Sequence, residues 1–502
     1  MNTLNQTPSV KKTILAQYFF VFVILFLFAL NLWYKCTLAL SYAPDLGGFE
    51  RNVIWGIQQI GLGNPLYGQT NDGSFAFIQY MPLYYYLISV IRQILSVDPL
   101  DAHSIYVIAR VFNLSICLIS SFLVFLMARK PLGVSVRIAL PIAVFSFLLM
   151  DQFAISGRPD SLKALFFQLL VFVLLRNPSR QIGYLSFFSI LFPILAFFTK
   201  QDGLVFCSIL PAVLLLQKDW KGFFLSSFIQ LGIVLGGLYY IQSSTNGNFF
   251  MNVVGGLQNG ISLSWFAGAF GNYFAIMAVL FSLALVLSVE FALGNSWNLN
   301  VLAASFIFSF FPQLVFSLKF GSGINYFTEC TFISCLFLAV FLNKIQSIQF
   351  FENEFSRWLL PAVAIILFFL ITSFHWITGV FINQESALKE KYENQKAVVK
   401  WMKDHSSNPS FKAMVLIQRQ WEDHLTTLLA DHVISPSRDV SSQVFMAKGG
   451  DDFKSLQKMV ETGGIDYMVS EMPAVPTYLG FDYSGYSLKA EVSGYYIFSH
   501  VH

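Results

Sequence analysis

Long apolar runs separated by short polar segments alternate through most of the chain. Runs of this length predict membrane-spanning helices, because about 20 helical residues cross the hydrocarbon core of a bilayer. We predict eleven spans, which lie at 13–37, 104–128, 136–155, 161–176, 181–198, 203–217, 222–241, 266–289, 299–318, 328–342 and 358–379. No small-residue cleavage site follows the first run, so we expect it to remain as a helix. The pattern predicts an α-helical polytopic membrane protein.

Basic residues are distributed unevenly between the loops, and this predicts an orientation. Cytoplasmic loops of membrane proteins carry an excess of Lys and Arg. The loops on the side of the N-terminus hold Lys11, Lys12, Arg129, Lys130, Arg137, Arg176, Arg180, Lys218, Lys221, Lys344 and Arg357. The opposite loops hold only Arg51, Arg92, Arg158, Lys200 and Lys319. We therefore expect a multi-pass protein of the cell membrane with a cytoplasmic N-terminus and an extracytoplasmic C-terminus.

A long loop after the first span departs from the simple alternation. Residues 41–103 form this predicted outer loop, in which Arg51–Ile60 is expected to be a short helix. An apolar stretch of about 15 residues then runs from Tyr80 to Leu95 with Arg92 inside it, too short for a span. A helix lying in the membrane interface fits it better, since tyrosines favour the headgroup level.

The C-terminal segment, 380–502, is more charged than the rest of the chain, and we predict that it forms a small external α/β domain. The transmembrane domain would accordingly cover 1–379. Within the tail, the pattern predicts helices at Glu385–Lys403 and between Gln420 and Asp431, and strands at Phe411–Gln418, Gly464–Ser470 and Tyr495–Ser499.

Composition supports the membrane class and excludes others. The chain is 55% hydrophobic and only 12% charged, with a mean hydropathy of +0.60. A net charge of +3 without a basic block gives no reason to expect nucleic acid as a partner. The five Cys and seven His show no metal-ligand spacing. We expect no cofactor and no metal site, although a divalent ion could assist.

Four polar clusters interrupt the apolar sequence, and the predicted topology places all of them on the outer side. They are Asp45–Glu50, Ser156–Asp160, Thr199–Gly203 and Lys319–Phe327. A charge at the mouth of a span is costly unless it is paired or used. Each cluster is therefore a candidate site.

The first cluster contains two carboxylates, Asp45 and Glu50. A carboxylate at a partly dry boundary has a raised pKa and can accept a proton near neutrality. Gly47 and Gly48 would let a ligand or another backbone approach closely. An equally plausible alternative is that Asp45 caps the following helix or pairs with Arg51.

Basic residues mark the other clusters. Arg158 suits bidentate capture of a phosphate, and Lys200 and Lys319 add positive charge at neighbouring outer turns. The alternatives are an internal pair between Arg158 and Asp160 that ties two helices together, and ordinary interfacial lysines. Three basic groups beside an acidic loop would suit an anionic lipid headgroup.

The order and style of these motifs resemble the GT-C superfamily of membrane glycosyltransferases, especially its aminoarabinose-transferase and protein-mannosyltransferase-like branch. The resemblance is carried by Asp45 in the first outer loop and by four segments, which are Tyr80-Met-Pro-Leu-Tyr-Tyr-Tyr-Leu87, Arg158-Pro-Asp-Ser-Leu162, Phe198-Thr-Lys-Gln-Asp-Gly203 and Asn325-Tyr-Phe-Thr-Glu329. Met81 stands where the family usually has a proline. No basic residue precedes Pro82, where some relatives place a phosphate-binding lysine.

The resemblance implies sugar transfer from a polyprenyl-phosphate donor to a lipid, glycan or protein acceptor, in a membrane and on its outer face. It implies that Asp45 is the base, with Glu50 or Asp160 orienting hydroxyl groups. Arg158, Lys200 and Lys319 would bind the donor phosphate. Tyr80, Tyr84, Gln201, Asp202, Asn325 and Tyr326 would contact the substrates.

Two other classes of protein remain open on the sequence. A transporter or flippase of an anionic lipid-linked sugar is one, although such proteins usually show inverted repeats and broken helices at the midplane. A non-catalytic scaffold for polysaccharide assembly is the other. It would need the external fold but neither Asp45 nor the basic residues.

Overall fold

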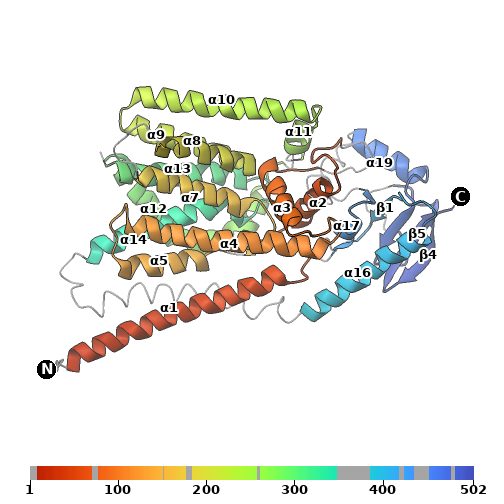
Figure 1. Ribbon diagram of the computed structural model, residues 1–502, viewed down its shortest axis with the longest axis horizontal. Coiled ribbons are helices and arrows are strands. Elements are labelled where there is room, and N and C mark those ends of the chain that lie inside the picture. The colour runs from red at the N-terminus through yellow and green to blue at the C-terminus, as the bar shows by residue number, and fades with distance from the viewer. Residues whose placement is uncertain are drawn as a thin grey trace.

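The computed structural model describes residues 8–69, 77–150, 152–176, 184–256, 260–294, 296–346, 385–417, 423–434, 451–475 and 481–501. A bundle of roughly parallel helices forms one end of the molecule, and a mixed helix–sheet region forms the other (Figure 1). The predicted last span, 358–379, and the join between the two predicted domains lie outside the described residues.

The bundle consists of α1 (Pro8–Leu40), α4 (Ala102–Arg129), α5 (Val136–Leu148), α7 (Asp160–Arg176), α8 (Tyr184–Thr199), α9 (Ile209–Leu216), α10 (Trp220–Ser244), α12 (Leu263–Ala292), α13 (Trp297–Ser317) and α14 (Thr328–Gln346). Six helical segments in the described chain are long and apolar enough to cross a membrane, namely Val21–Leu40, Ala102–Arg129, Trp220–Ser244, Leu263–Ala292, Trp297–Ser317 and Ile324–Ile345. Shorter apolar helices accompany them at Val136–Leu148, Phe187–Thr199 and Gln201–Leu216.

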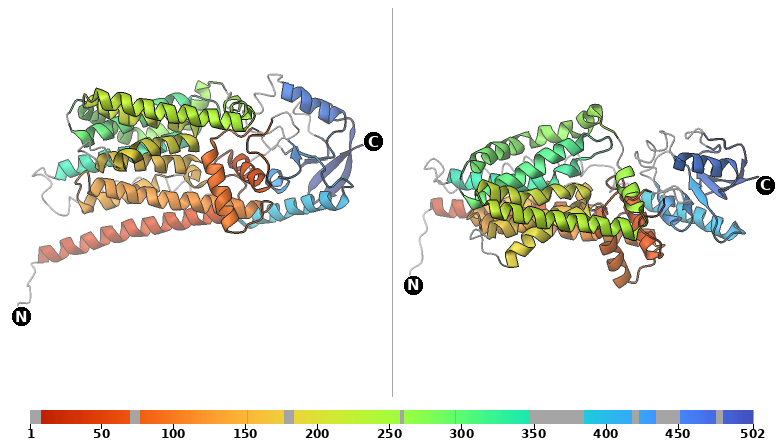
Figure 2. Two further views of the ribbon diagram at one scale, coloured as in Figure 1. Left: turned by 45° about the horizontal axis from the view of Figure 1, so that its top comes forward. Right: turned by 90° about the horizontal axis from the view of Figure 1, so that it is seen from above.

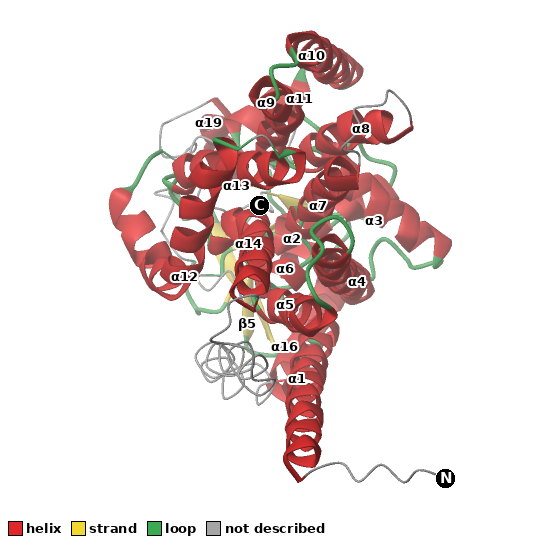
Figure 3. Cartoon of the chain, turned by 90° about the vertical axis from the view of Figure 1, so that its left-hand side faces the viewer, coloured by secondary structure: helices red, strands yellow, loops and turns green. Residues whose placement is uncertain are grey.

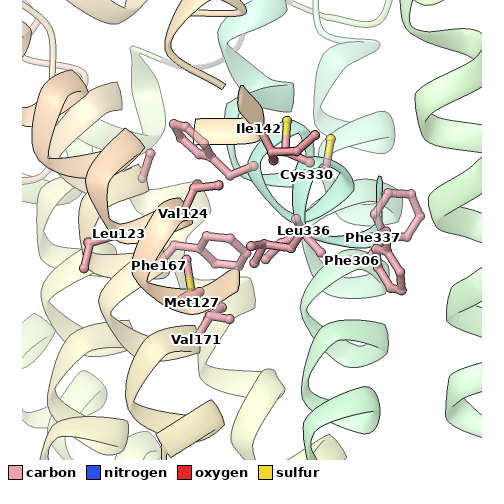
Figure 4. Close-up of a cluster of buried hydrophobic side chains, with 14 of the residues drawn as sticks. Leu123, Val124, Met127, Ile142, Phe167, Val171, Phe306, Cys330, Leu336 and Phe337 are labelled. Carbon is pink, nitrogen blue, oxygen red and sulfur yellow. The ribbon is translucent and has the colours of Figure 1, made fainter. Parts of the chain in front are cut away.

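The centre of the bundle is a dry core to which several helices contribute. Figure 4 shows Val124 of α4, Ile142 of α5 and Phe167 of α7 facing Phe306 of α13 and Leu336 of α14. The view along the bundle in Figure 3 places α10 at one margin and α1 at another. Large apolar side chains remain exposed on both of these helices. Such a surface suits contact with lipid tails, so the chain has the architecture of a polytopic membrane protein.

Two predicted spans are interrupted. The span predicted at 136–155 ends as α5 at Leu148, and a short helix, α6 (Gln152–Ile155), follows it. The span predicted at 203–217 begins as a 3-10 helix, η1 (Gln201–Ser208), before it becomes α9. Both interruptions lie at the end of the bundle where the polar clusters gather. Each one places a polar cluster next to a short helical segment.

The predicted outer loop contains both expected helices. They are α2 (Glu50–Gly61) and α3 (Pro82–Ile94), and Pro82 occupies the start of α3, where its missing N–H is harmless. Both helices are amphipathic, and they pack against each other beside the bundle (Figure 1). Two short segments, α11 (Asn248–Phe250) and the π-helix η2 (Met251–Gly255), follow α10 in the chain. The 3-10 helix η3 (Ile324–Phe327) directly precedes α14.

The C-terminal residues form a mixed five-stranded sheet in the order β2-β1-β3-β5-β4. Its strands are β1 (Ala413–Val415), β2 (Val433–Ile434), β3 (Tyr467–Ser470), β4 (Tyr486–Val492) and β5 (Tyr495–His500). The pairs β1–β2 and β1–β3 are parallel, whereas β3–β5 and β4–β5 are antiparallel. In the described part of this region the helices are α16 (Glu385–His405), α17 (Leu425–Leu428) and α19 (Asp451–Glu461). Figure 2 shows α16 and α19 on different sides of the sheet.

Side chains alternate between the two faces of this sheet, as the two-residue period of a strand requires. Val415 and Val469 belong to the cluster that includes α16, whereas Met414 and Met468 pack with the apolar side of α19. The helix predicted at Glu385–Lys403 is present as α16, and the three predicted strands are present as β1, β3 and β5. Both β1 and β3 are shorter than predicted. The helix between Gln420 and Asp431 is reduced to α17, and β2, β4 and α19 were not predicted.

Candidate active site

All four polar clusters meet at one end of the helical bundle, where the chain adjoins the C-terminal sheet region (Figures 1 and 2). They meet because α1 and α8 end there, whereas α4, α7 and α14 begin there. Antiparallel neighbours bring every second turn to the same side. The alternation in the sequence therefore predicted correctly that the clusters share one end of the bundle.

The first polar loop is anchored by a buried ion pair. Arg110 Nε lies 2.7 Å from Glu50 Oε1, and Arg110 Nη2 lies 2.8 Å from Oε2, with both side chains completely shielded from solvent. Glu50 also accepts hydrogen bonds from the backbone N–H groups of Leu46 and Gly157. Every oxygen of this carboxylate is therefore engaged. The geometry supports a structural role for Glu50 in fixing the loop that carries Asp45.

Asp45 lies at the turn between α1 and α2. Its Oδ1 accepts a hydrogen bond from the backbone N–H of Gly47 at 3.0 Å. Burial, together with the nearby Glu50 carboxylate, raises the pKa of Asp45 to about 6. A carboxylate with such a pKa is mostly ionised at neutral pH and can still take up a proton. The turn is tight, since Gly48 has a φ of 62° and Phe49 a φ of 65°.

Arg158 ties this loop to the second cluster. Its Nη1 donates to the carbonyl oxygens of Gly47 and, at 3.1 Å, Gly48. Its Nη2 donates to Tyr80 Oη at 3.3 Å, and its Nε lies 3.2 Å from Asp160 Oδ2. Burial opposes its charge, but these acidic neighbours raise the pKa of Arg158 above its ordinary value. The guanidinium thus faces the Asp45 loop, Tyr80 and Asp160, so Arg158 is placed to hold the Asp45 loop.

Asp160 connects three clusters through one carboxylate. Lys200 Nζ and Asn325 Nδ2 both lie 2.7 Å from Asp160 Oδ1, while Arg158 approaches the other oxygen. Lys200 also lies over the ring of Tyr326, with 4.4 Å between its Nζ and the ring centroid. Burial disfavours the charged lysine, but the two aspartates beside it raise the pKa of Lys200. Lys200 therefore carries its charge at neutral pH.

A second layer of charges lies beneath Lys200. Lys163 of α7 is completely buried, and its Nζ lies 2.7 Å from Asp202 Oδ2 and 3.1 Å from Glu329 Oε1. Lys200 Nζ is 3.9 Å from the same Asp202 oxygen. Asp202 is thus shared between two lysines, and Lys163 holds it more closely. Such a network must be well paired, because an uncompensated buried charge is strongly destabilising.

A cavity of about 380 Å³ opens beside this network. Its lining comprises Lys200, Gln201, Asp202, Gly260, Ile261, Val315, Phe316, Lys319 and Tyr326. The predicted site residues Lys200, Gln201, Asp202, Lys319 and Tyr326 thus meet in one cavity. Two ammonium groups and an apolar wall suit a ligand with an anionic group and a hydrocarbon part.

A larger cavity of about 640 Å³ lies beside α3 and the end of α10. Its lining includes Tyr67, Tyr86, Tyr240 and Asn246, and none of the described lining residues is charged. Tyr67 Oη donates to the backbone carbonyl of Tyr80 at 2.8 Å, so the wall of this cavity adjoins the segment that meets Arg158. The charged cavity is the better candidate for phosphate chemistry because it alone of the two carries cations.

The remaining predicted residues lie deeper or to one side. Tyr80 and Asn325 contact the charged network, but neither belongs to the cavity lining. Tyr84 is completely buried in α3 and packs against Phe112, with 6.3 Å between ring centroids. In this structure Tyr84 therefore contributes to the packing of α3 and is shielded from any ligand.

Sequence reasoning missed two residues of the network. Arg110 was not singled out, although a charge inside the predicted span 104–128 was a usable signal. Lys163, which lies one turn after Asp160 in the sequence, was not predicted as a site residue either. Among the described residues, no group of three or more His, Cys, Asp or Glu side chains is arranged to hold a metal ion.

Comparison with known proteins identifies the fold. Neither protein-family models nor curated proteins show a match to the sequence. Solved structures do. ArnT from Cupriavidus metallidurans in the apo state superposes with a TM-score of 0.61 at 13% identity, covering 99% of each chain. The same protein bound to undecaprenyl phosphate gives a TM-score of 0.60 at 13% identity, covering 95% of this chain and 98% of ArnT.

An archaeal enzyme shares the fold as well. The Archaeoglobus fulgidus oligosaccharyltransferase, tethered to an acceptor peptide, superposes with a TM-score of 0.56 at 12% identity and covers 96% of this chain and 74% of its own. The chain therefore has the GT-C fold of ArnT and the oligosaccharyltransferase, as the resemblance of its motifs predicted. At these identities the likeness concerns the fold, and the activity must be argued from the site.

Proposed function

We propose that the chain is a glycosyltransferase that moves a hexosyl or pentosyl group from a polyprenyl-phosphate-linked donor. The acceptor would be a hydroxyl or amine of a lipid, glycan or protein on the extracytoplasmic side of the cell membrane. The observation that carries the proposal is the cavity in which Lys200 and Lys319 face an apolar wall. ArnT, which shares the fold, was solved bound to undecaprenyl phosphate, a ligand of this chemistry.

In this mechanism the lysines stabilise the leaving group. Sugar transfer passes through an oxocarbenium-like transition state. The departing lipid phosphate is already stable as an anion, so it needs positive charge more than a proton. Lys200 and Lys319 would supply that charge, while Asp160, to which Asn325 donates a hydrogen bond, holds Lys200 in place.

Asp45 would accept the proton of the acceptor. Its raised pKa places it near the range in which a general base works best at neutral pH. Arg158 and Glu50 would act on it indirectly. Arg158 holds the carbonyls of Gly47 and Gly48, and Glu50 fixes the beginning of α2 through Arg110.

The proposed topology follows from the charge bias of the loops. The transmembrane part, 1–379, would have a cytoplasmic N-terminus, and the tail, 380–502, would cover the acceptor from outside. Supporting this arrangement, Tyr42, which precedes Asp45, contacts the tail, because its N–H donates to Glu385 Oε1 at 3.2 Å. A reporter that is active only outside the cytoplasm, fused to the C-terminus, should be active, and a cytoplasmic readout there would overturn the orientation.

Reconstitution tests the activity. The purified protein in liposomes should transfer a radiolabelled sugar from an undecaprenyl-phosphate-linked donor to membrane or glycan acceptors, releasing undecaprenyl phosphate, without an ion gradient. A Lys200→Ala/Lys319→Ala variant should lose donor binding, because each charge-assisted contact contributes about 1.5–3 kcal/mol. Lys130→Ala, which removes an exposed lysine at the opposite end of the bundle, is the matched control. Movement of the labelled lipid between leaflets without a glycosylated product would support a flippase instead.

A further inference from the structure

Two hydrogen-bond acceptors in the wall of the charged cavity lack a donor. Gln201 and Asp202 both line this cavity. Gln201 Oε1 and Asp202 Oδ1 are shielded from solvent, and neither has a hydrogen-bond partner within the described part of the chain. A buried acceptor without a donor is unfavourable, so each oxygen favours a ligand that brings an O–H or N–H group.

Both acceptors are held in place through their other polar atom. Gln201 Nε2 donates to the backbone carbonyl of Gln79 at 3.1 Å, which fixes the orientation of the amide. Lys163 Nζ binds Asp202 Oδ2 at 2.7 Å. Neither side chain can turn to satisfy its free oxygen without breaking a bond that it already makes. The pair is therefore organised before any ligand arrives.

The carboxylate lies directly beside the proposed phosphate-binding lysine. Asp202 Oδ2 is 3.9 Å from Lys200 Nζ. In the proposed donor, the sugar is attached to the phosphate that Lys200 binds. The first atoms of that sugar must then lie within reach of Gln201 and Asp202, which neighbour Lys200 in the chain and in the cavity wall.

Resting on the proposed function, we infer that Gln201 and Asp202 form the subsite for the donor's sugar and select sugars by charge. The subsite accepts sugars that present hydroxyl or ammonium groups. It disfavours acidic sugars, because a sugar carboxylate would meet the fixed carboxylate of Asp202 in a poorly solvated site.

Lys163 acts here as a positioning residue. It holds the Asp202 oxygen at 2.7 Å, whereas Lys200 is 3.9 Å away. Without Lys163, Asp202 could move onto Lys200 and compete with the donor phosphate. Glu329, which lies 3.1 Å from Lys163, offsets the remaining charge of that lysine.

Binding of three lipids to the purified full-length protein tests the inference. The probes are undecaprenyl phosphate, undecaprenyl phosphoglucose and undecaprenyl phosphoglucuronate, of which the last two differ only in the carboxylate at C6. We expect the wild type to bind the glucuronate at least about tenfold more weakly than the glucose lipid. Asp202→Asn should bring that ratio close to one. Equal affinities in the wild type, or an unchanged ratio in Asp202→Asn, would overturn the subsite.

Controls separate this result from misfolding and from failure of the proposed function. Asp98→Asn, which removes an exposed carboxylate that is not part of the cavity lining, should keep the wild-type ratio. If Asp202→Asn does not fold, the charge-compensated Lys163→Gln/Asp202→Asn variant provides the same measurement. A wild type that fails to bind even undecaprenyl phosphate contradicts the proposed function. One that binds it but shows a ratio of one contradicts only the sugar subsite.

Discussion

Arg110 and Glu50 form a two-pronged ion pair from which solvent is completely excluded, with nitrogen–oxygen distances of 2.7 and 2.8 Å. Arg110 also donates to the backbone carbonyls of Ser41 and Ala43. One guanidinium thus joins three places: the end of α1 at Ser41, the following loop at Ala43 and the start of α2 at Glu50. This geometry makes the pair a structural centre of this end of the bundle.

Removing one member of this pair should be severe. Arg110→Met is expected to destabilise the protein by about 3–5 kcal/mol, because it leaves a buried carboxylate without its partner. Thermal unfolding in detergent, followed by the loss of monodisperse protein, measures the effect. Lys130→Met should change little. A wild-type unfolding temperature for Arg110→Met would show that Glu50 finds another partner.

The proposed base predicts a pH profile. Asp45 must be ionised to accept a proton, and its pKa is raised to about 6. The rate of sugar transfer should therefore fall as the pH decreases through about 6 and level off above about 7. Initial rates between pH 5 and 8 would reveal the midpoint. Asp45→Asn should abolish transfer over the same range while the protein still binds the donor lipid, and activity within a few-fold of the wild type would remove Asp45 from the role of base.

Arg158 offers a test between two roles. If it holds the Asp45 loop through Gly47 and Gly48, Arg158→Lys should lower kcat by roughly ten- to a hundredfold and leave donor KM nearly unchanged. Lysine cannot reproduce the fork-shaped contacts of the guanidinium. Steady-state kinetics with varied donor concentration separate the outcomes. A rise in donor KM at constant kcat would instead indicate direct contact between Arg158 and the phosphate.

The tail should detach when its polar contacts are removed. Asp423 Oδ2 lies 3.1 Å from Arg51 Nη1, and Gln58 and Gln59 donate to the carbonyls of Thr427 and Ala430. We expect Asp423→Ala to increase hydrogen exchange in both α2 and α17, because it removes the ion pair that joins them. Asp482→Ala, a change at an exposed carboxylate in the loop before β4, is the control. Unchanged exchange in α2 would mean that the amide contacts alone hold the tail.

The sequence predicted the helices well because the bilayer imposes length and hydropathy on each span independently. It also predicted that the polar clusters would meet. Consecutive spans run in opposite directions, so every second loop lies at the same end of the bundle. The partners within the site were not predictable. Asp160 bonds to Lys200 and Asn325, 40 and 165 positions further along the chain, and such pairings depend on helix packing.

The tail shows the same division. Tyr467–Ser470 and Tyr495–His500 are apolar strands and were predicted, at least in part. Tyr486–Val492 is a strand at the edge of the sheet with mostly exposed side chains, so its composition resembles that of a loop. The end of α5 at Leu148, inside a predicted span, was not predicted either. Hydropathy alone does not specify where the chain leaves a helix to reach the polar site.

The interacting residues of the site are far apart in the sequence, so the site is assembled in a fixed order during synthesis. Asp160 and Lys163 enter the membrane with α7, but Asn325 and Glu329 are translated more than a hundred residues later. Until α14 inserts, Lys163 lacks one of its two carboxylate partners. The buried ionic network is therefore completed only when α14 is in place, long after α7 has been made.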